Sequence, residues 1–384
     1  MAFIDTNRLK TALFDLIGWK DFYDATEIPA LGLDTTDSGE YYNTDYLSFD
    51  LDIIKATIPT NRTLSEYLTT QTEAGITYMA NKLKNHKLIK RAVKSQLQNF
   101  TLFPVGGMKN NTVAKSGRFV GIRFQLKPEV GIKVVLPRVG FQFDSAQTDL
   151  PIYLFHSSKD TPVLSFNITT VAGFTWHWDT DNVITMYSDS TDITGGYYYL
   201  GYYENDVTGS AITFKRDYFQ WNKGFCSPCG YRSYDDKYKK VLNWMSMSAI
   251  SVNSGDFVEG EIFSDEDVNY TPDTNYGINF NINIECDITN YLVENKSQLT
   301  TMLGNCVAYK IMKGVEYSQQ RNFVNDDLAG SVQVELNGLE SNEMIDSIAK
   351  QIQDSVNALT IDQAELSSVC FPCYKKGSAR YGVA

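Results

Sequence analysis

The sequence predicts an α+β protein in which a central antiparallel β-sandwich or jelly roll is inserted into a helical domain formed by the N- and C-terminal segments. Two observations lead to this prediction. Apolar residues recur at helical spacing near both ends of the chain. Between about Arg118 and Val252 the period changes to two, in short β-branched and aromatic runs separated by turns. With 384 residues, 43% of them hydrophobic, the chain is long enough for two or three folded domains.

Residues 1–28 predict an amphipathic N-terminal helix, because apolar residues such as Leu9 and Leu13 recur at helical spacing among charged ones. In residues 29–60 the composition changes to Gly, Thr, Asp and Tyr, and we expect an extended arm or loop. A loop of this length is unusual inside a compact monomer. Its central part, Leu31 to Phe49, is therefore expected to lie on a neighbouring subunit.

Residues 61–103 predict one long helix with a kink near Gly75. Thr63 and Glu66 have the spacing of a capping box, in which each side chain bonds to the backbone N–H of the other residue. The second half of this segment is basic. A charge run of this kind indicates either a solvated helix face or a surface that meets an acidic partner.

Residues 117–265 are expected to form the β-sandwich domain, with runs such as RFVGIRFQL and GYYYLGYY as strands. The strand pattern continues through KVLNWMSMSAISV into an acidic segment, Ser254 to Asp273, which holds seven carboxylates and no cation. Residues 280–384 predict a C-terminal helical segment that pairs with the N-terminal helices. Within it, SVQVELNGL is expected to be extended and Glu340 to Leu359 to be helical.

The charge balance excludes some classes of partner. With 34 basic and 46 acidic residues the net charge is −12, so sequence-specific nucleic-acid binding and docking on anionic membranes are not expected. No apolar run approaches the ~20 residues that span a bilayer, and the N-terminal residues do not form a signal-peptide pattern. We therefore expect synthesis in a reducing cytosol, where the six cysteines do not form a disulfide framework.

The most specific chemical signal is a C-x-P-C motif that occurs twice, at residues 226–229 and 370–373. Two thiolates at this spacing hold one side of a tetrahedral ion. The two motifs together predict a structural zinc ion, with four ligands: Cys226, Cys229, Cys370 and Cys373. Two alternatives remain open. The thiols can be free or locally paired in two unrelated turns, or the first motif can be a redox centre, which needs a βαβ context.

The sequence contains no recognisable catalytic constellation, and the protein is expected not to be an enzyme. The three histidines, His86, His156 and His177, stand in no metalloprotease or triad motif and are expected to be structural. Cys286 and Cys306 are expected to be small core residues, because they lie on apolar faces.

Aromatic residues offer a different kind of candidate site. Trp176 and Trp178 share one face of a predicted strand, and five tyrosines between Tyr197 and Tyr203 crowd a neighbouring hairpin. Flat rings of this kind stack on sugars, so one interpretation is a carbohydrate-binding surface. The other is that these rings are core or protein-contact residues, since Tyr and Trp combine a large area with one polar group.

Two stretches, TDLPIYLFHSSKDTPVLSFNI and CDITNYLVENKSQLTTMLGNCVAYKIMKGVEYSQQRN, resemble virion structural proteins of tailed phages and prophages of gut Bacteroidales, including crAss-like phages. The resemblance implies a non-enzymatic component of the neck, tail or baseplate, a ring or adaptor that acts by subunit–subunit docking. Its expected partners are further copies of the chain in a homo-oligomeric ring and other virion proteins. The expected location is the virion, assembled in the host bacterial cytoplasm. The alternative is a carbohydrate-binding module on the virion surface.

Overall fold

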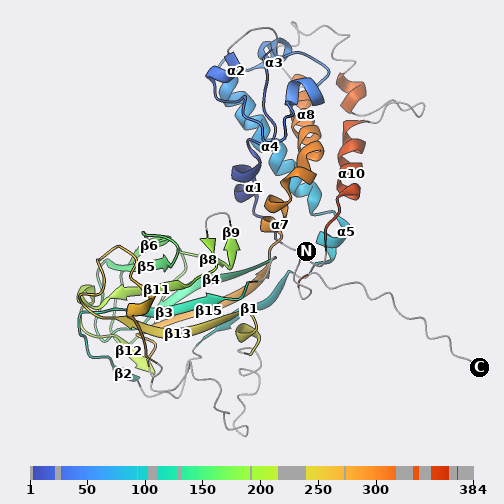
Figure 1. Ribbon diagram of the computed structural model, residues 1–384. Helices are drawn as coiled ribbons and strands as arrows, with labels where there is room; N and C mark the ends of the chain where they lie inside the picture. The colour runs from blue at the N-terminus through green and yellow to red at the C-terminus, as the bar shows by residue number, and fades with distance from the viewer. Residues whose placement is uncertain are drawn as a thin grey trace, which may run out of the picture. The chain divides into compact units, whose positions relative to one another are not determined.

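The computed structural model describes residues 3–21, 27–92, 94–102, 110–128, 131–190, 193–214, 239–271, 274–316, 332–336, 347–362 and Cys370. The chain divides into two compact units. Unit 1 combines Met1–Val93 with Asp287–Ala384, and its described elements are helical; unit 2 is the continuous stretch Lys94–Cys286 and carries the β-strands (Figure 1). The predicted α+β class is therefore confirmed.

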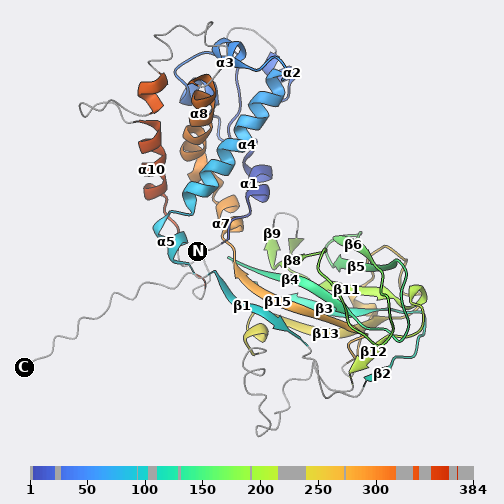
Figure 2. The same ribbon diagram turned by 180° about the vertical axis from the view of Figure 1, so that it is seen from behind.

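Unit 1 is built from short and long helices drawn from both ends of the chain. In chain order they are α1 (Thr6–Leu13), α2 (Glu27–Ala30), the π-helix η1 (Tyr42–Tyr46), α3 (Leu51–Thr57), α4 (Leu64–Leu83), α5 (Lys87–Arg91), α7 (Thr289–Glu294), the 3₁₀-helix η5 (Lys296–Leu299), α8 (Thr300–Glu316) and α10 (Ile348–Ala358). Helices α4 and α8 pack along each other, and α10 packs on α8 (Figure 1, Figure 2). The segments before and after unit 2 in the sequence thus share one core.

Helix α4 begins at the predicted capping box. The Thr63 hydroxyl accepts from the Glu66 N–H at 3.2 Å, and the Glu66 carboxylate accepts from the Thr63 N–H at 2.9 Å. The helix ends at Leu83, whereas one helix was expected over 61–103. The rest of that segment contains α5 and the strand β1 (Ser95–Thr101), because the backbone there pairs with a strand far along the chain.

Helix α4 is continuous through Gly75, from Leu64 to Leu83. A Cβ atom at this position would lie 2.4 Å from Cγ2 of Val307 in α8. Glycine therefore stands where the two helices approach closely, and the missing side chain is what allows that approach.

Residues 29–60, predicted as an extended arm or loop, pack on their own unit and combine short helices with stretches that have no regular structure. Tyr42 and Phe49 are 0% and 5% exposed, and the Tyr42 N–H donates to the Gly18 carbonyl at 2.9 Å. The Trp19 and Tyr42 rings lie 5.0 Å apart. Because several aromatic side chains in this segment find apolar neighbours within unit 1, the segment folds back and includes α2, η1 and α3.

The C-terminal segment also differs from the prediction. The predicted C-terminal segment begins at residue 280, but Ile278–Cys286 is the strand β15, and the alternation of Ile and Phe with Asn along INFNINIEC carries its period of two. The first helix of the segment was expected to be capped by Asp287 or Thr289, and α7 begins at Thr289. Residues 332–336, expected to be extended, are helical. The expected helix from Glu340 to Leu359 is present as α10 from Ile348 to Ala358; the predicted start of that helix lies outside the described residues.

Unit 2 contains β1, β15 and a series of strands between them. In chain order these are β2 (Asn110–Thr112), β3 (Phe119–Leu126), β4 (Ile132–Phe141), β5 (Leu150–His156), β6 (Leu164–Ile168), β7 (His177–Asp179), β8 (Ile184–Tyr187), β9 (Asp189–Ser190), β10 (Ile193–Thr194), β11 (Tyr198–Tyr203), β12 (Ile212–Phe214), β13 (Met245–Val252) and β14 (Val268–Tyr270). The β-unit therefore extends beyond the predicted limits of 117–265 at both ends.

Two larger antiparallel sheets make up most of unit 2. A five-stranded sheet has the order β1-β15-β4-β7, with β8 also paired to β4, and a six-stranded sheet has the order β14-β13-β3-β11-β5-β6 (Figure 1). Strands β9 and β10, and β2 and β12, form separate pairs. Strands β7 and β8 lie along the same edge of β4 and are interrupted opposite Pro137 and Arg138. Pro137 has no N–H to donate, which weakens the ladder at that point.

The six-stranded sheet is covered on both faces. On one face Phe124 of β3 meets Phe280 of the five-stranded sheet, with ring centroids 5.2 Å apart. On the other face lies a buried aromatic cluster that includes Phe119, Phe155 and Tyr203, and Phe263 from the predicted acidic segment packs on it. The acidic segment is therefore a cover for this sheet, held by its apolar residues.

Candidate functional site

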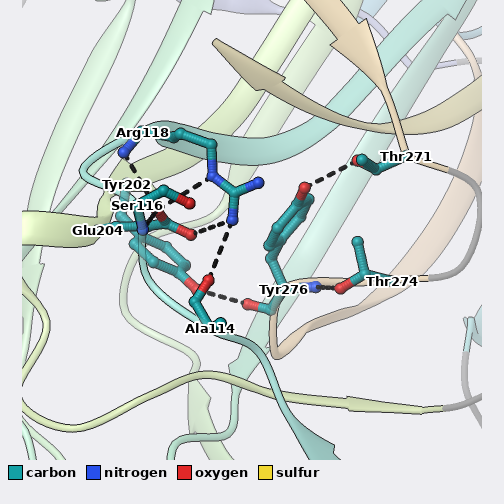
Figure 3. Close-up of polar contacts among 8 residues, drawn as sticks. All are labelled: Ala114, Ser116, Arg118, Tyr202, Glu204, Thr271, Thr274 and Tyr276. Carbon is teal, nitrogen blue, oxygen red and sulfur yellow. Dashed lines mark hydrogen bonds and ion pairs between the residues drawn. The ribbon is translucent and has the colours of Figure 1, made fainter. Parts of the chain in front are cut away.

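The most densely bonded buried charge of the described residues is Glu204, directly after β11 (Figure 3). Its carboxylate accepts hydrogen bonds from the backbone N–H groups of Ser116 at 2.8 Å and Arg118 at 3.1 Å. The Arg118 guanidinium donates to both carboxylate oxygens, at 2.7 and 3.2 Å. The Glu204 side chain is only 5% exposed, so four donors neutralise and solvate a charge that water does not reach.

Two tyrosines extend this cluster toward the other sheet. The Tyr202 hydroxyl donates to the Tyr276 carbonyl at 2.7 Å, and the Tyr276 hydroxyl lies 2.8 Å from the Thr271 hydroxyl (Figure 3). The Arg118 guanidinium stands 5.9 Å from the centre of the Tyr276 ring. Burial raises the pKa of Tyr202 well above its ordinary value, so this phenol stays neutral.

The arrangement connects β11 of one sheet to the residues that lead into β15 of the other. Every polar group named in this cluster forms a hydrogen bond with another protein group. The Glu204 carboxylate alone accepts four hydrogen bonds. The Tyr202–Tyr276 hydrogen bond joins the two sheets, whereas the Arg118–Glu204 pair joins the start of β3 to the end of β11 within the six-stranded sheet. Sequence reasoning missed it, because Arg118 and Glu204 are 86 residues apart and nothing local pairs them.

His156, considered from the sequence, has both ring nitrogens occupied. Nε2 lies 2.9 Å from the Gly195 carbonyl, to which it donates, and Nδ1 accepts from the hydroxyl of Ser158 at 2.7 Å. Burial lowers the pKa of this histidine, and the neutral ring fits both bonds. Burial also lowers the pKa of His86. His156 therefore acts as a structural residue of β5.

The predicted zinc ligands are only partly within the described residues. Cys226, Cys229 and Cys373 lie outside them, so the four-cysteine site stays a prediction. Cys370 is fully buried and disulfide-bonded, and a disulfide sulfur offers no thiolate to zinc. Within the described residues, no group of three or more His, Cys, Asp or Glu side chains is placed to hold a metal.

The other two cysteines considered, Cys286 and Cys306, differ in their bonding. Cys286 at the end of β15 is a buried core residue, as expected. It is also disulfide-bonded, as is Cys370, which differs from the expectation that the cysteines form no disulfides. Cys306 in α8 is a free, buried thiol, as expected. Burial raises its pKa to about 12, so the thiol is protonated and unreactive.

The tyrosine cluster of β11 belongs to the core. The residues involved are all at most 2% exposed: Tyr198, Tyr199, Tyr202 and Tyr203. Because the strand is buried on both faces, tyrosines at odd and even positions alike disappear from the surface. These four rings are therefore not available to stack on a sugar.

Trp176 and Trp178 are half-buried, with ring centroids 6.1 Å apart and planes inclined by 32°. Trp178 pairs directly with Gly140, and its ring lies over that glycine. The Arg138 guanidinium stands 4.5 Å from the Trp178 ring. The structure thus adds Arg138 to the two tryptophans as a partner that sequence reasoning did not find. Only the register between β4 and β7 shows that Arg138 lies beside Trp178.

Comparison with known proteins gives no family. No family model matches the sequence, and no curated protein matches it. A crystal structure of three domains of the flagellar cap protein FliD from Escherichia coli is similar at 14% identity and a TM-score of 0.12, over 71% of this chain and 75% of that chain. A TM-score this low carries no argument about fold or function. None of the described helices has the length and apolar character needed to cross a membrane.

Proposed function

We propose that this chain is a non-enzymatic structural component of a tailed-phage virion, a ring or adaptor at the neck, tail or baseplate. It acts by docking further copies of itself and other virion proteins, and it reaches the virion by assembly in the cytoplasm of the bacterial host. Support comes from the resemblance of residues 148–168 and 286–322 to such proteins. A second support is the set of apolar side chains that unit 2 presents to solvent.

These exposed side chains carry the proposal. Unit 2 contributes six of the eight large apolar residues exposed among those described: Val163, Val171, Phe174, Val183, Val258 and Tyr270. Val171 and Phe174 are 93% and 64% exposed in one loop. Exposed apolar area costs about 25 cal/mol per Å² relative to burial, so the loop that displays both Val171 and Phe174 favours an interaction surface.

The loop that carries Phe174 is held in place. Its N–H donates to the Phe143 carbonyl at 2.7 Å, and its carbonyl accepts from the Gln142 side chain at 2.9 Å. Phe174 has a φ of +63°, a conformation that costs a non-glycine residue on the order of 1 kcal/mol. The backbone around Phe174 is thus fixed and strained while the ring is exposed to solvent. We expect such an arrangement where a partner protein covers the ring, because a pre-formed loop loses little entropy on binding.

We infer further that unit 2 is a β-sandwich or jelly roll inserted into a helical domain formed by the two ends of the chain. Contacts between the two sheets support this description. Besides Phe124 and Phe280, Phe143 and Tyr202 meet edge to face, with ring centroids 5.5 Å apart. In a ring-forming chain, a β-sandwich inserted into a helical domain is a suitable unit for binding a second protein.

The experiment is to measure the assembly state of the purified chain over a wide concentration range by sedimentation velocity and electron microscopy. We expect closed rings, and we expect them or their binding of other virion proteins to be weakened by the double variant Val171→Ser/Phe174→Ser. The control is Leu31→Ser, at an exposed apolar residue of unit 1. A chain that stays monomeric at the highest concentration and binds no virion protein refutes the proposal.

A second candidate function, a carbohydrate-binding surface on the virion, is favoured by Trp178 and Arg138. The half-buried indole is fixed over Gly140, beside a guanidinium that can donate to sugar hydroxyls. A glycan array with the wild-type protein and Trp178→Ala tests it, with Tyr270→Ala as the control at a distant exposed ring. Binding that Trp178→Ala abolishes supports the candidate; no sugar bound by either protein removes it.

We also propose, on the repeated C-x-P-C motif, that the reduced chain, in which the Cys370 disulfide is opened to a thiol, holds a structural zinc ion with Cys226, Cys229, Cys370 and Cys373. The test is metal analysis of protein purified without chelator, with and without prior reduction. Reduced protein is expected to hold one zinc per chain, and the double variant Cys229→Ser/Cys373→Ser to lose it. Less than about half an equivalent in the reduced wild type contradicts the site.

A further inference from the structure

A basic–aromatic surface lies on the two long helices of unit 1. We define it by Tyr78 and Lys82 of α4 and by Tyr309, Lys310 and Lys313 of α8. The two tyrosine rings are stacked, 5.1 Å apart and inclined by only 5°. Lys310 and Lys82 place their Nζ atoms 4.8 and 5.1 Å from the Tyr78 ring centre. All five side chains are half-buried, so the cations are held against the rings.

Among the described residues, the charge of this surface is only partly neutralised. Lys313 pairs with Glu316 at 2.8 Å. Throughout the described part of the chain, no carboxylate lies within 4.0 Å of Lys82 or Lys310. The sequence around α4 adds to the imbalance, because residues 74–94 contain six Lys and Arg and no Asp or Glu. Such a concentration is unusual in a chain whose net charge is −12, and it predicts an anionic partner.

Unit 2 carries a surface of the opposite kind. We call it the acidic strip and define it by its exposed carboxylates: Asp256, Glu259, Glu261, Asp265 and Glu266. It also exposes one large apolar side chain, Val258, at 61%. No cation occurs anywhere between Ser254 and Asp273.

The acidic strip is pre-organised. Phe263 is buried against the aromatic cluster of the six-stranded sheet, and Phe257 and Ile262 pack on the same cluster. The Gly260 N–H donates to the Tyr203 hydroxyl at 2.9 Å, and the Ile262 N–H donates to the Asp160 carbonyl at 3.0 Å. The backbone that carries the carboxylates is therefore held in place, which reduces the entropy lost when a partner binds the segment.

We propose that the acidic strip of one copy docks on the basic–aromatic surface of a second copy. This inference rests on the proposed function and names the contact that builds the ring. The lysines meet carboxylates, and the stacked tyrosines provide an apolar floor for Val258. The two surfaces differ, so the contact is heterologous, and repeating it leads from copy to copy until a ring closes. It also lets chains of high like charge associate.

The experiment uses two charge-reversed full-length chains. The first is Lys82→Glu/Lys310→Glu, in the basic–aromatic surface, and the second is Glu259→Lys/Glu261→Lys, in the acidic strip. Each alone is expected to weaken self-association at least about tenfold. Mixed in equal amounts they are expected to assemble again, because each altered surface then meets its complement on the other chain. Circular dichroism confirms that both variants are folded.

The controls carry the same charge changes elsewhere. Lys239→Glu/Lys240→Glu and Asp34→Lys/Asp52→Lys alter exposed residues outside both surfaces and are expected to leave the dissociation constant within about twofold. If the wild type assembles and the two reversed chains assemble equally well, this inference fails and the proposed function stands. If each reversed chain is impaired and mixing does not restore assembly, the contact between copies is also refuted. A wild type that never assembles removes the proposed function itself.

Discussion

Replacing Glu204 by alanine tests the interpretation of Arg118–Glu204 as a buried ion pair that stabilises unit 2 by joining the end of β11 to the start of β3. The substitution removes an acceptor from four hydrogen bonds and leaves the Arg118 guanidinium, whose side chain is 20% exposed, without its counter-charge. Breaking a buried ion pair from one side costs about 3–5 kcal/mol. The N–H groups of Ser116 and Arg118 also lose their acceptor, which costs about 1–3 kcal/mol for a buried group and less at Ser116, which is exposed. Because these costs overlap, we expect unit 2 to lose about 4 kcal/mol.

The expected loss of stability in Glu204→Ala comes mainly from leaving the Arg118 charge without a counter-charge. Removing both charges together is therefore expected to cost less. In the double variant Arg118→Met/Glu204→Gln, both charges disappear, while the glutamine carbonyl can still accept from the N–H groups of Ser116 and Arg118. We expect this variant to lose less than half of what Glu204→Ala loses. Glu259→Ala, at an exposed carboxylate, is the control and is expected to change stability by less than about 0.5 kcal/mol.

Urea unfolding followed by tryptophan fluorescence provides the measurement. Of the five tryptophans only Trp19 lies in unit 1, so a Trp19→Phe background makes the emission report on unit 2. Free energies are compared only where the slope of the transition is unchanged. A loss below about 1 kcal/mol for Glu204→Ala, or a double variant as unstable as Glu204→Ala, refutes the assignment of Arg118–Glu204 as a stabilising buried ion pair.

Three further predictions concern packing, protonation and helix capping. Gly75→Ala is expected to destabilise unit 1 by about 1–3 kcal/mol despite the better helix propensity of alanine, and Val307→Ala in the same chain is expected to recover part of the loss in thermal unfolding. Burial lowers the pKa of His156 below 6.5, so the unfolded chain binds the proton more tightly than the folded one. The contribution of this histidine to the free energy of unfolding is therefore largest above pH 6.5, and it falls as the pH drops through the lowered pKa of the folded state. Urea titrations from about pH 7 to about pH 5 are expected to show a smaller decline for His156→Gln, with His86 supplying a remainder of the same sign; an unchanged slope contradicts this. Thr63→Ala is expected to cost unit 1 about 1 kcal/mol, whereas Thr63→Ser retains the cap, and equal stability of the two variants speaks against the capping box.

The sequence predicted well where structure is local. The capping box of Thr63 and Glu66 needs only residues three positions apart, and it is present. The change of period near Arg118 marks the first long strand of the six-stranded sheet, β3, and the apolar spacing after Ser347 marks α10. These features depend on the backbone repeat alone, which the order of residues carries directly.

Two mistakes came from reading a local pattern without its partner. The alternation in INFNINIEC was in the sequence, but its neighbours β1 and β4 lie more than 100 residues earlier, so nothing nearby showed that a strand was needed there. Similarly, residues 29–60 have the composition of a loop, yet Tyr42 and Phe49 find apolar neighbours within unit 1. Composition shows that a segment has no regular repeat; it does not show what the segment packs against.

The sequence by itself determined the α+β class, the start of α4 and the abundance of rings and carboxylates in unit 2. Only the tertiary structure decided which rings are buried, why Gly75 is a glycine, that Arg118 and Glu204 meet, and that the acidic segment covers a sheet with its charges outward. The physical reason is that burial and pairing depend on which distant residues share a surface. A periodic pattern fixes which side chains point the same way, but the free energy that each side chain contributes to folding depends on which distant residues pack against it.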